Sequence, residues 1–131
     1  MKIHHIGIVV PSIKDSLGEI VKILQFDIGH SSLIGSQKVN VCFLQAGGAY
    51  IELIEPAESN SPVSKFAKEG GGIHHICFEV KDIYEEIDKM IGAGARLIVK
   101  PVEGFEGRLT AFIWMGMKNT KWNLIELAEE K

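Results

Sequence analysis

Hydrophobic residues cluster in two similar stretches of the chain, residues 3–10 and 73–80, which are both rich in Ile and Val. Such β-branched runs predict strands. An amphipathic segment follows each one, with apolar residues three or four positions apart, which predicts one helix per half. The apolar positions of the two predicted helices are Ile13, Leu17, Ile20, Val21 and Leu24, and then Ile83, Ile87, Met90 and Ile91.

Polar residues mark where these helices should begin. Ser12 with Asp15, and Asp82 with Glu85, fit the N-terminal capping pattern. Further strand-like runs cover residues 38–45, 49–54, 110–115 and 123–128. A short helix is predicted from Ser61-Pro62 to about Lys68, ended by Gly70-Gly71-Gly72.

The two halves are related by an internal repeat. His4-His5-Ile6 returns as His74-His75-Ile76, an offset of 75 − 5 = 70 residues. Ile51-Glu52-Leu53 returns as Ile125-Glu126-Leu127, an offset of 126 − 52 = 74, so the second half gained four residues between these two motifs. One structural unit used twice explains this pattern. We expect a first module over about 1–58, a connecting helix over about 61–69 and a second module over about 72–131.

Composition narrows the class of protein. A chain of 131 residues, 46% hydrophobic and 24% charged, is the size of one globular domain. The formal net charge is −3 and no Lys/Arg-rich run occurs, so we expect no nucleic-acid partner. The longest apolar stretches are too short to span a membrane and no signal peptide is evident. Two distant cysteines, Cys42 and Cys77, form no disulfide framework, so we expect a cytoplasmic protein.

Strand parity suggests where the polar residues point. Alternate side chains of a strand face opposite ways, so His5 and His75 lie opposite the Ile and Val side chains that should pack under the helices. The same parity turns Glu52 and Glu126 away from their apolar neighbours. If the halves pack as a pseudo-symmetric pair, these four residues converge in one cleft.

Two histidines and two carboxylates suit a borderline divalent ion such as Co, Mn, Ni, Zn or Fe. Taken alone, either histidine would more often be a hydrogen-bonded structural residue. The repetition, with an acid inside each apolar strand, favours a metal site, because a buried carboxylate is costly unless it is paired or bound to metal. We interpret His4 and His74 as structural, Glu55 and Glu129 as solvated, His30 as a surface loop residue and both cysteines as core residues.

The chain resembles the vicinal oxygen chelate superfamily, and within it methylmalonyl-CoA epimerase-like proteins. The resemblance covers essentially the whole chain. It is carried by residues 5–8 with Pro11, Ile51-Glu52-Leu53-Ile54-Glu55-Pro56, Ser61-Pro62-Val63-Ser64-Lys65-Phe66, residues 72–80 and Leu124-Ile125-Glu126-Leu127.

The resemblance implies an α+β fold, in which two tandem βαβββ modules form a curved mixed sheet around a central metal cleft. It also implies one divalent ion held by His5, Glu52, His75 and Glu126, with Glu126 and Glu52 as acid–base groups. The substrate would be a small molecule, a thioester for an epimerase, and a homodimer remains open. Two segments depart from the epimerase pattern, Gly104-Phe105-Glu106-Gly107 and residues 112–118, and no carboxylate occurs between Ser31 and Ile51.

Three functions are compatible with these observations. The first is an epimerase or isomerase of an acyl-CoA thioester, acting by enolate stabilisation and proton transfer. The second is a lactoylglutathione lyase, resembling glyoxalase I. The third is a non-catalytic small-molecule binding protein, against which the intact set of four ligands weighs. An extradiol dioxygenase fits less well, because such enzymes use three ligands and Glu52 would be superfluous.

Overall fold

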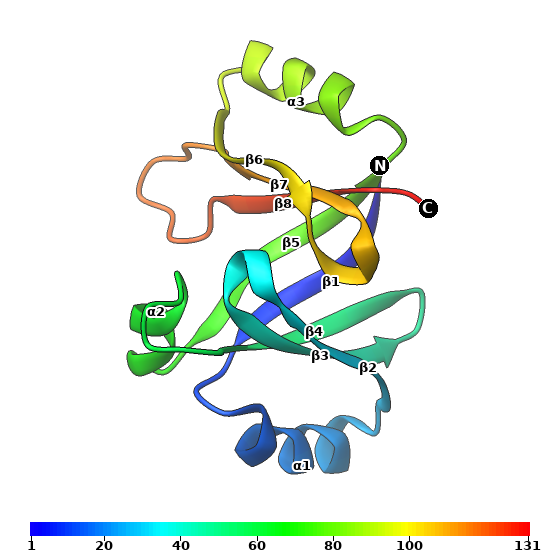
Figure 1. Ribbon diagram of the computed structural model, residues 1–131, viewed down its shortest axis with the longest axis vertical. Coiled ribbons are helices and arrows are strands. Elements are labelled where there is room, and N and C mark those ends of the chain that lie inside the picture. Colours follow the sequence, from blue (N-terminus) through cyan, green and yellow to red (C-terminus); the bar gives the residue numbers. More distant parts are fainter. The chain divides into compact units, whose positions relative to one another are not determined.

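The computed structural model describes residues 1–131 and contains two βαβββ modules in tandem. Within each module the strands form a mixed sheet, as predicted, in the order β2-β3-β4-β1 in the first module and β5-β8-β7-β6 in the second. β1 pairs with β4, and β5 with β8, in parallel, and the hairpin partners are antiparallel. The elements, labelled in Figure 1, are β1 (Lys2–Val9), α1 (Ile13–Leu24), β2 (Asp27–Ile34), the 3-10 turn η1 (Gly35–Gln37), β3 (Val39–Ala46), β4 (Ala49–Pro56), α2 (Ser64–Lys68), β5 (Gly72–Val80), α3 (Ile83–Gly92), β6 (Arg96–Glu103), the 3-10 turn η2 (Phe105–Gly107), β7 (Leu109–Trp114) and β8 (Leu124–Glu129).

One compact unit comprises His5–His74. Its core lies between α1 and the sheet, where Cys42, Leu44 and Leu53 are almost fully buried. Partly buried apolar side chains of the predicted helix stripe pack on this core, namely Ile13, Leu17, Ile20 and Val21. Burial of this stripe holds α1 on its strands.

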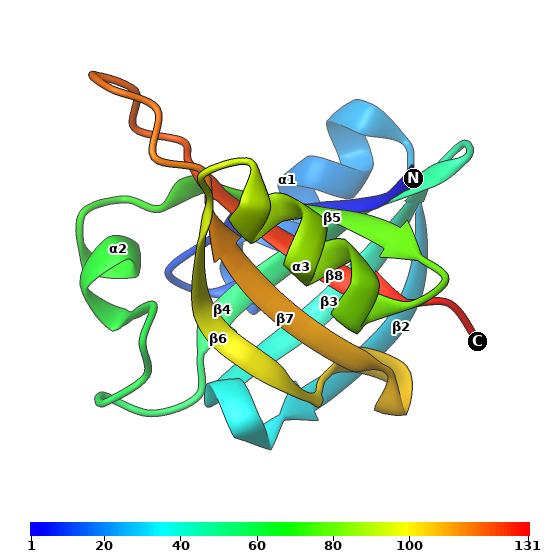
Figure 2. The same ribbon diagram turned by 90° about the horizontal axis from the view of Figure 1, so that it is seen from above.

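The second compact unit comprises Met1–His4 together with His75–Lys131. Figure 2 shows α3 lying over β7 and β8, and Ile83 and Ile87 of this helix are buried against Ala111, Ile113 and Leu127. The two helices therefore have equivalent places in their own modules, as the repeat predicts.

The capping predictions are confirmed. The Ser12 hydroxyl accepts a hydrogen bond from the backbone N–H of Asp15 at 3.1 Å, and the Asp82 carboxylate accepts from Tyr84 and Glu85. The stripes are shorter than predicted, because Leu24 and Ile91 are 53% and 46% exposed. Both residues lie in the last turn of their helix, where Val21 and Met90 pack on the cores instead.

Two strands were absent from the runs identified by residue pattern. β2 and β6 are the edge strands of the sheet and most of their side chains are exposed, so neither has the apolar alternation of a half-buried strand. His30 lies in β2 and is exposed, so the interpretation of a surface residue is confirmed but its placement in a loop is wrong.

The short helix begins later than predicted. α2 starts at Ser64, and Ser61 instead lies in the preceding turn, where its hydroxyl accepts a hydrogen bond from the N–H of Val63. The triple glycine ends this helix as expected. Gly71 has φ +71°, and a Cβ there would lie 2.0 Å from the carbonyl oxygen of Val9, so only glycine fits the position.

The extra residues of the second module lie in one hairpin connection. β3 and β4 pair from Phe43 opposite Glu52, and β7 and β8 from Phe112 opposite Glu126. The Phe and Glu positions are nine residues apart in the first hairpin and fourteen in the second, so the second connection gained 14 − 9 = 5 residues. Phe112 follows Phe43 by 112 − 43 = 69 residues rather than 70, so one residue was lost before this hairpin. Asn123 holds the longer connection, residues 115–123, through side-chain hydrogen bonds with Met117 and Thr120.

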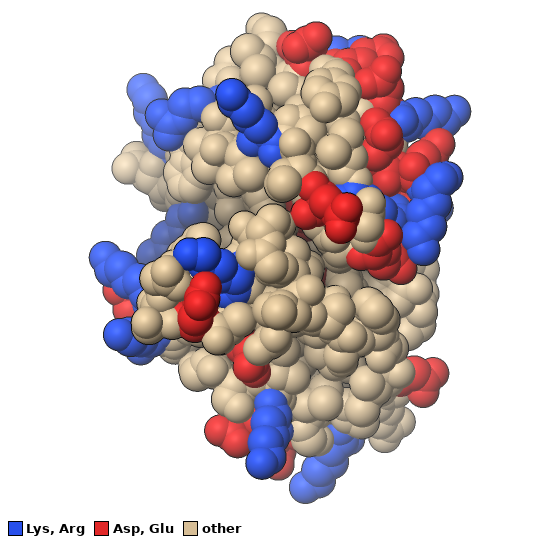
Figure 3. Space-filling view, in the orientation of Figure 1, with Lys and Arg blue, Asp and Glu red and all other residues tan.

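The surface charges and the lengths of the helices agree with the expectations drawn from the composition. On the face seen in Figure 3, acidic and basic side chains lie interspersed. None of the helices is long and apolar enough to span a membrane.

Candidate metal and active site

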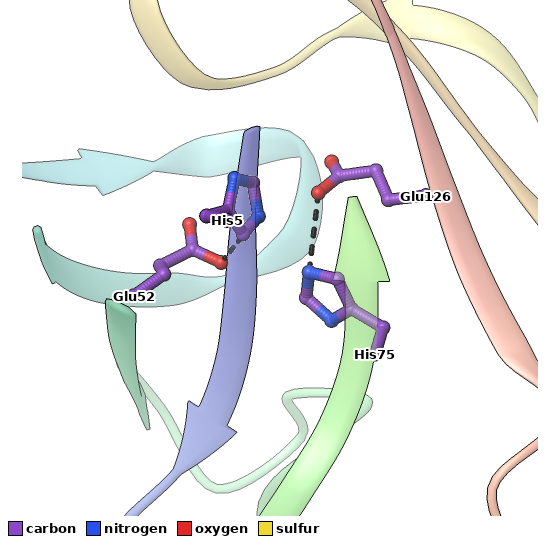
Figure 4. Close-up of side chains that lie close together, drawn as sticks. All are labelled: His5, Glu52, His75 and Glu126. Carbon is purple, nitrogen blue, oxygen red and sulfur yellow. Dashed lines mark ion pairs between the residues drawn. The ribbon is translucent and has the colours of Figure 1, made fainter. Parts of the chain in front are cut away.

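The first half of the site consists of His5 on β1 and Glu52 on β4. The parallel register of these strands places Gly7 beside Glu52, so the His5 and Glu52 side chains project from neighbouring positions. His5 Nε2 lies 3.1 Å from Glu52 Oε1, and the two side chains are 0% and 4% exposed (Figure 4). This is a buried His–Glu pair at ion-pair distance.

The second half repeats this geometry with His75 on β5 and Glu126 on β8. Here Cys77 is the register partner of Glu126, and Cys77 follows His75 by two residues as Gly7 follows His5. His75 Nε2 lies 3.1 Å from Glu126 Oε1, with both side chains 3% exposed (Figure 4). The same strand register therefore produces the same pair in each module.

The parity argument is confirmed in both halves. Ile8 and Val10 pack on the core beneath α1, while the His5 and Glu52 side chains meet each other instead. Each module thus holds one buried His–Glu pair, and these four residues offer a set of donors that could bind a metal ion. The donors fit a borderline divalent cation, because two imidazole nitrogens are combined with two carboxylates whose burial as anions is costly without a positive partner.

A phenylalanine borders each pair, and the sequence interpretation did not single out either one. The Phe43 ring lies 5.4 Å from the His5 ring at 77°, and the Phe112 ring lies 5.3 Å from the His75 ring at 89°. Both rings are buried. Strand parity was the sequence signal that could have found them, because each Phe lies opposite its glutamate across a hairpin and therefore faces the same side.

His4 and His74 are half-buried and pack on other aromatic rings. His4 lies 4.8 Å from Phe105 of η2, and His74 lies 5.6 Å from Phe66 of α2. Their aromatic partners thus come from η2 and α2 rather than from the long helices α1 and α3. The two histidines of each His-His pair project to opposite faces of the strand.

Glu55 and Glu129 are not merely solvated, so that prediction is wrong. Glu55 Oε1 accepts a hydrogen bond from the N–H of Ile13 at 2.7 Å, and Glu129 Oε2 accepts one from Ile83 at 3.0 Å. Ile13 and Ile83 are the first residues of α1 and α3. A carboxylate there satisfies an unpaired helical N–H and favours the positive end of the helix dipole. Each ligand strand is thereby connected to its helix.

An ion-pair cluster joins β5 to η2 in the second unit. Arg108 Nη1 donates to Glu79 Oε2 at 2.6 Å and Nε donates to Glu106 Oε1 at 3.1 Å. The hydrogen bond from Arg108 holds the pKa of Glu79 below its ordinary value. Glu106, in the segment that departs from the epimerase pattern, is therefore paired within this cluster.

Comparison with known proteins identifies the family. Residues 4–112 match the glyoxalase/bleomycin resistance protein/dioxygenase superfamily. The chain belongs to this superfamily. Its relatives within the superfamily include uncharacterized protein YqjC of Bacillus subtilis, 39% identical over 99% of this chain and 93% of that protein. An ethylmalonyl-CoA/methylmalonyl-CoA epimerase of Cereibacter sphaeroides is 31% identical over 86% of this chain and 87% of its own length.

Solved structures of the superfamily agree with the fold. A Streptomyces coelicolor methylmalonyl-CoA epimerase in complex with 2-nitronate-propionyl-CoA has a TM-score of 0.86 and 27% identity, covering 99% of this chain and 94% of that chain. The vicinal oxygen chelate fold inferred from the resemblance is therefore confirmed. The superfamily includes enzymes such as methylmalonyl-CoA epimerase.

Proposed function

We propose that this protein is a metal-dependent epimerase or isomerase of an acyl-CoA thioester, of the methylmalonyl-CoA epimerase type. The observation that carries the proposal is the duplicated, buried His–Glu pair, present intact in both modules. Sequence similarity to an ethylmalonyl-CoA/methylmalonyl-CoA epimerase over most of the chain supports the choice of acyl-CoA.

In this proposal His5, Glu52, His75 and Glu126 hold one divalent ion. When bound, such an ion supplies Lewis-acid stabilisation of negative charge that develops on a substrate carbonyl oxygen. Two imidazole nitrogens and two carboxylates would then share the coordination of the ion.

Glu126 acts as the general base and removes the proton next to the thioester carbonyl. Epimerisation needs a proton to return on the opposite face, so a second acid–base group is required. We assign this role to Glu52, the equivalent acid of the first module. Exclusion of water around these buried side chains strengthens their electrostatic effect on the substrate.

A second candidate function is that of a lactoylglutathione lyase. One observation favours it: β3 (Val39–Ala46) contains no carboxylate, so the site lacks the additional acid that the epimerase resemblance places there. A lyase of this kind moves a proton between adjacent carbons, which one ligand glutamate can do alone.

The deciding experiment is a proton-exchange assay in deuterated buffer. The metal-free protein is incubated with methylmalonyl-CoA, or with a glutathione thiohemiacetal, with and without added Co²⁺. We expect Co²⁺-dependent incorporation of deuterium at the α-carbon of methylmalonyl-CoA, measured by mass spectrometry.

Turnover of the thiohemiacetal without exchange on methylmalonyl-CoA would instead support the lyase. Binding of either compound with no exchange and no turnover would support a non-catalytic binding protein. A cytoplasmic location and a homodimer remain predictions, although two buried cysteines that form no disulfide suit a reducing compartment.

A further inference from the structure

Each buried His–Glu pair has a phenylalanine in an equivalent place. Phe43 lies directly opposite Glu52 across the β3–β4 hairpin, and Phe112 lies directly opposite Glu126 across β7–β8. Side chains directly opposite in an antiparallel pair have Cβ atoms about 5 Å apart. Each phenylalanine therefore borders both the glutamate and the histidine of its own module.

The ring geometry is that of an attractive aromatic contact. The His5–Phe43 and His75–Phe112 centroids are 5.4 and 5.3 Å apart with interplanar angles of 77° and 89°. Edge-to-face pairs prefer separations of about 4.5–7 Å. Phe43 and Phe112 are 4% and 8% exposed, so each histidine ring rests on a dry surface that offers no competing donor or acceptor.

The rest of this hairpin face differs between the modules. The strand registers pair Val41 with Ile54 and Thr110 with Ala128, and at the other end Gln45 with Tyr50 and Trp114 with Leu124. Of the six equivalent positions on this face, only the phenylalanine and the glutamate are the same residue in both halves. Divergence everywhere else argues that the shared phenylalanine is needed beside the pair.

We infer that Phe43 and Phe112 are positioning residues for metal binding, which fix the ring orientation of His5 and His75. This inference rests on the proposed function for the ion itself. An imidazole that can rotate must be ordered when it binds an ion, and a ring already held in place avoids that cost. Groups that orient metal ligands typically change affinity by about 10- to 100-fold when they are lost.

The chain offers matched controls. Phe66 and Phe105 contact His74 and His4, the neighbouring histidines outside the proposed ligand set. Phe43→Leu and Phe112→Leu remove a ring beside a ligand histidine, while Phe66→Leu and Phe105→Leu remove one beside a histidine that is not a ligand. All four variants lose a buried or packed ring, so loss of stability alone does not distinguish the two groups.

Two measurements test the inference. The first is Co²⁺ affinity by chelator competition, together with the Co²⁺ absorption spectrum. The second is the set of imidazole NMR signals of the metal-free protein. We expect about a tenfold or greater loss of affinity, an altered spectrum, and shifted or broadened His5 or His75 signals in Phe43→Leu and Phe112→Leu, with affinity within about twofold of wild type in the controls.

Unchanged affinity and an unchanged Co²⁺ spectrum in both test variants would overturn the inference. An equal loss of affinity in the controls would do so as well. If the wild type binds no ion, the proposed metal site fails and the metal-free NMR comparison decides whether the rings position His5 and His75. Phe→Met variants, whose flexible side chain adapts to the space left by the ring, replace any Leu variant that does not fold.

Discussion

At the scale of single residues, the carboxylate of Glu126 combines two properties that can be separated. It lies 3.1 Å from His75 Nε2 in a buried pair, and it is the proposed base. Glutamine in its place keeps an oxygen that can coordinate an ion, but this oxygen cannot accept the substrate proton. Loss of catalysis and loss of metal therefore need not go together.

For Glu126→Gln we expect deuterium exchange on methylmalonyl-CoA to fall by about 10²-fold or more, the usual contribution of a general base. Metal content should fall much less. Exchange is measured by mass spectrometry and metal by elemental analysis of the same sample. Exchange at the wild-type rate would move the base to another residue.

Much of this pair geometry could be predicted from the sequence, because strand parity and the repeat act on the same four residues. What could not be predicted depended on partners distant in sequence. Glu55 has the same alternation as an exposed strand-end acid, and only the fold brings it to the N–H of Ile13, 42 residues away. Phe43 and Phe112 could not be told apart from the other apolar residues of their strands, because the histidines they contact are also distant in sequence.

At the scale of secondary-structure elements, the glutamate three residues after each ligand connects a strand to a helix. Glu129 lies at the end of β8 and accepts from the first N–H of α3. Glu55, the equivalent residue of the first module, connects β4 to α1 in the same way. The helix N-terminus is therefore fixed by its own cap and by a residue of the ligand strand.

Glu129→Ala should lower the free energy of unfolding by about 1 kcal/mol, because it removes both an acceptor and a negative charge at a helix N-terminus. Glu129→Gln should cost less, since it keeps the acceptor. Urea unfolding followed by circular dichroism, with EDTA present, measures the difference. Glu130→Ala, at an exposed neighbouring position, serves as the control and should change little.

The contact between Arg108 and Glu79 makes stability depend on pH. Because the pKa of Glu79 is lowered in the folded protein from an ordinary value of 4.5, its contribution is fully present above that value and is lost as the pH falls through the lowered pKa. Arg108→Gln should reduce the free energy of unfolding at pH 7 by about 1–3 kcal/mol and weaken this acid dependence.

The test is urea unfolding of both proteins between neutral and acid pH. Lys2→Gln is the matched control, because its ammonium lies 3.5 Å from the same carboxylate but its side chain is 80% exposed. Exposed pairs contribute about 0–1 kcal/mol. An Arg108→Gln profile parallel to that of the wild type would show that this pair does not carry the acid dependence.

At the scale of the whole molecule, each module contributes one His–Glu pair, so an ion bound by all four residues should stabilise the entire chain. A ligand that binds only the folded state at 100 times its Kd adds about 2.7 kcal/mol. We expect added Co²⁺ to raise Tm in the wild type, and His5→Ala and His75→Ala each to lose most of that rise and most bound ion. Thermal unfolding with Co²⁺ and with EDTA measures the shift.

His74→Ala is the control, because its ring contacts Phe66 and lies outside the proposed set. Stoichiometric metal in both His75→Ala and Glu52→Ala proteins would contradict the assignment of the four ligands.

Like the geometry of the His–Glu pairs, much of the order of elements could be predicted from the sequence. Capping residues and buried helix stripes identified α1 and α3, and apolar runs identified the inner strands. The edge strands β2 and β6 could not be recognised by residue pattern, since their exposure removes the alternation, and the resemblance supplied them.

The longer β7–β8 connection has an evolutionary consequence. Adding an odd number of residues inside a strand would turn every later side chain to the opposite face, and Glu126 would then point away from His75. Five residues added at the tip of a hairpin leave the alternation of side chains along both strands unchanged. The Asn123 side chain holds the added segment through hydrogen bonds within that segment. After duplication, one copy could therefore acquire a new segment while the His–Glu pair of each copy kept its geometry.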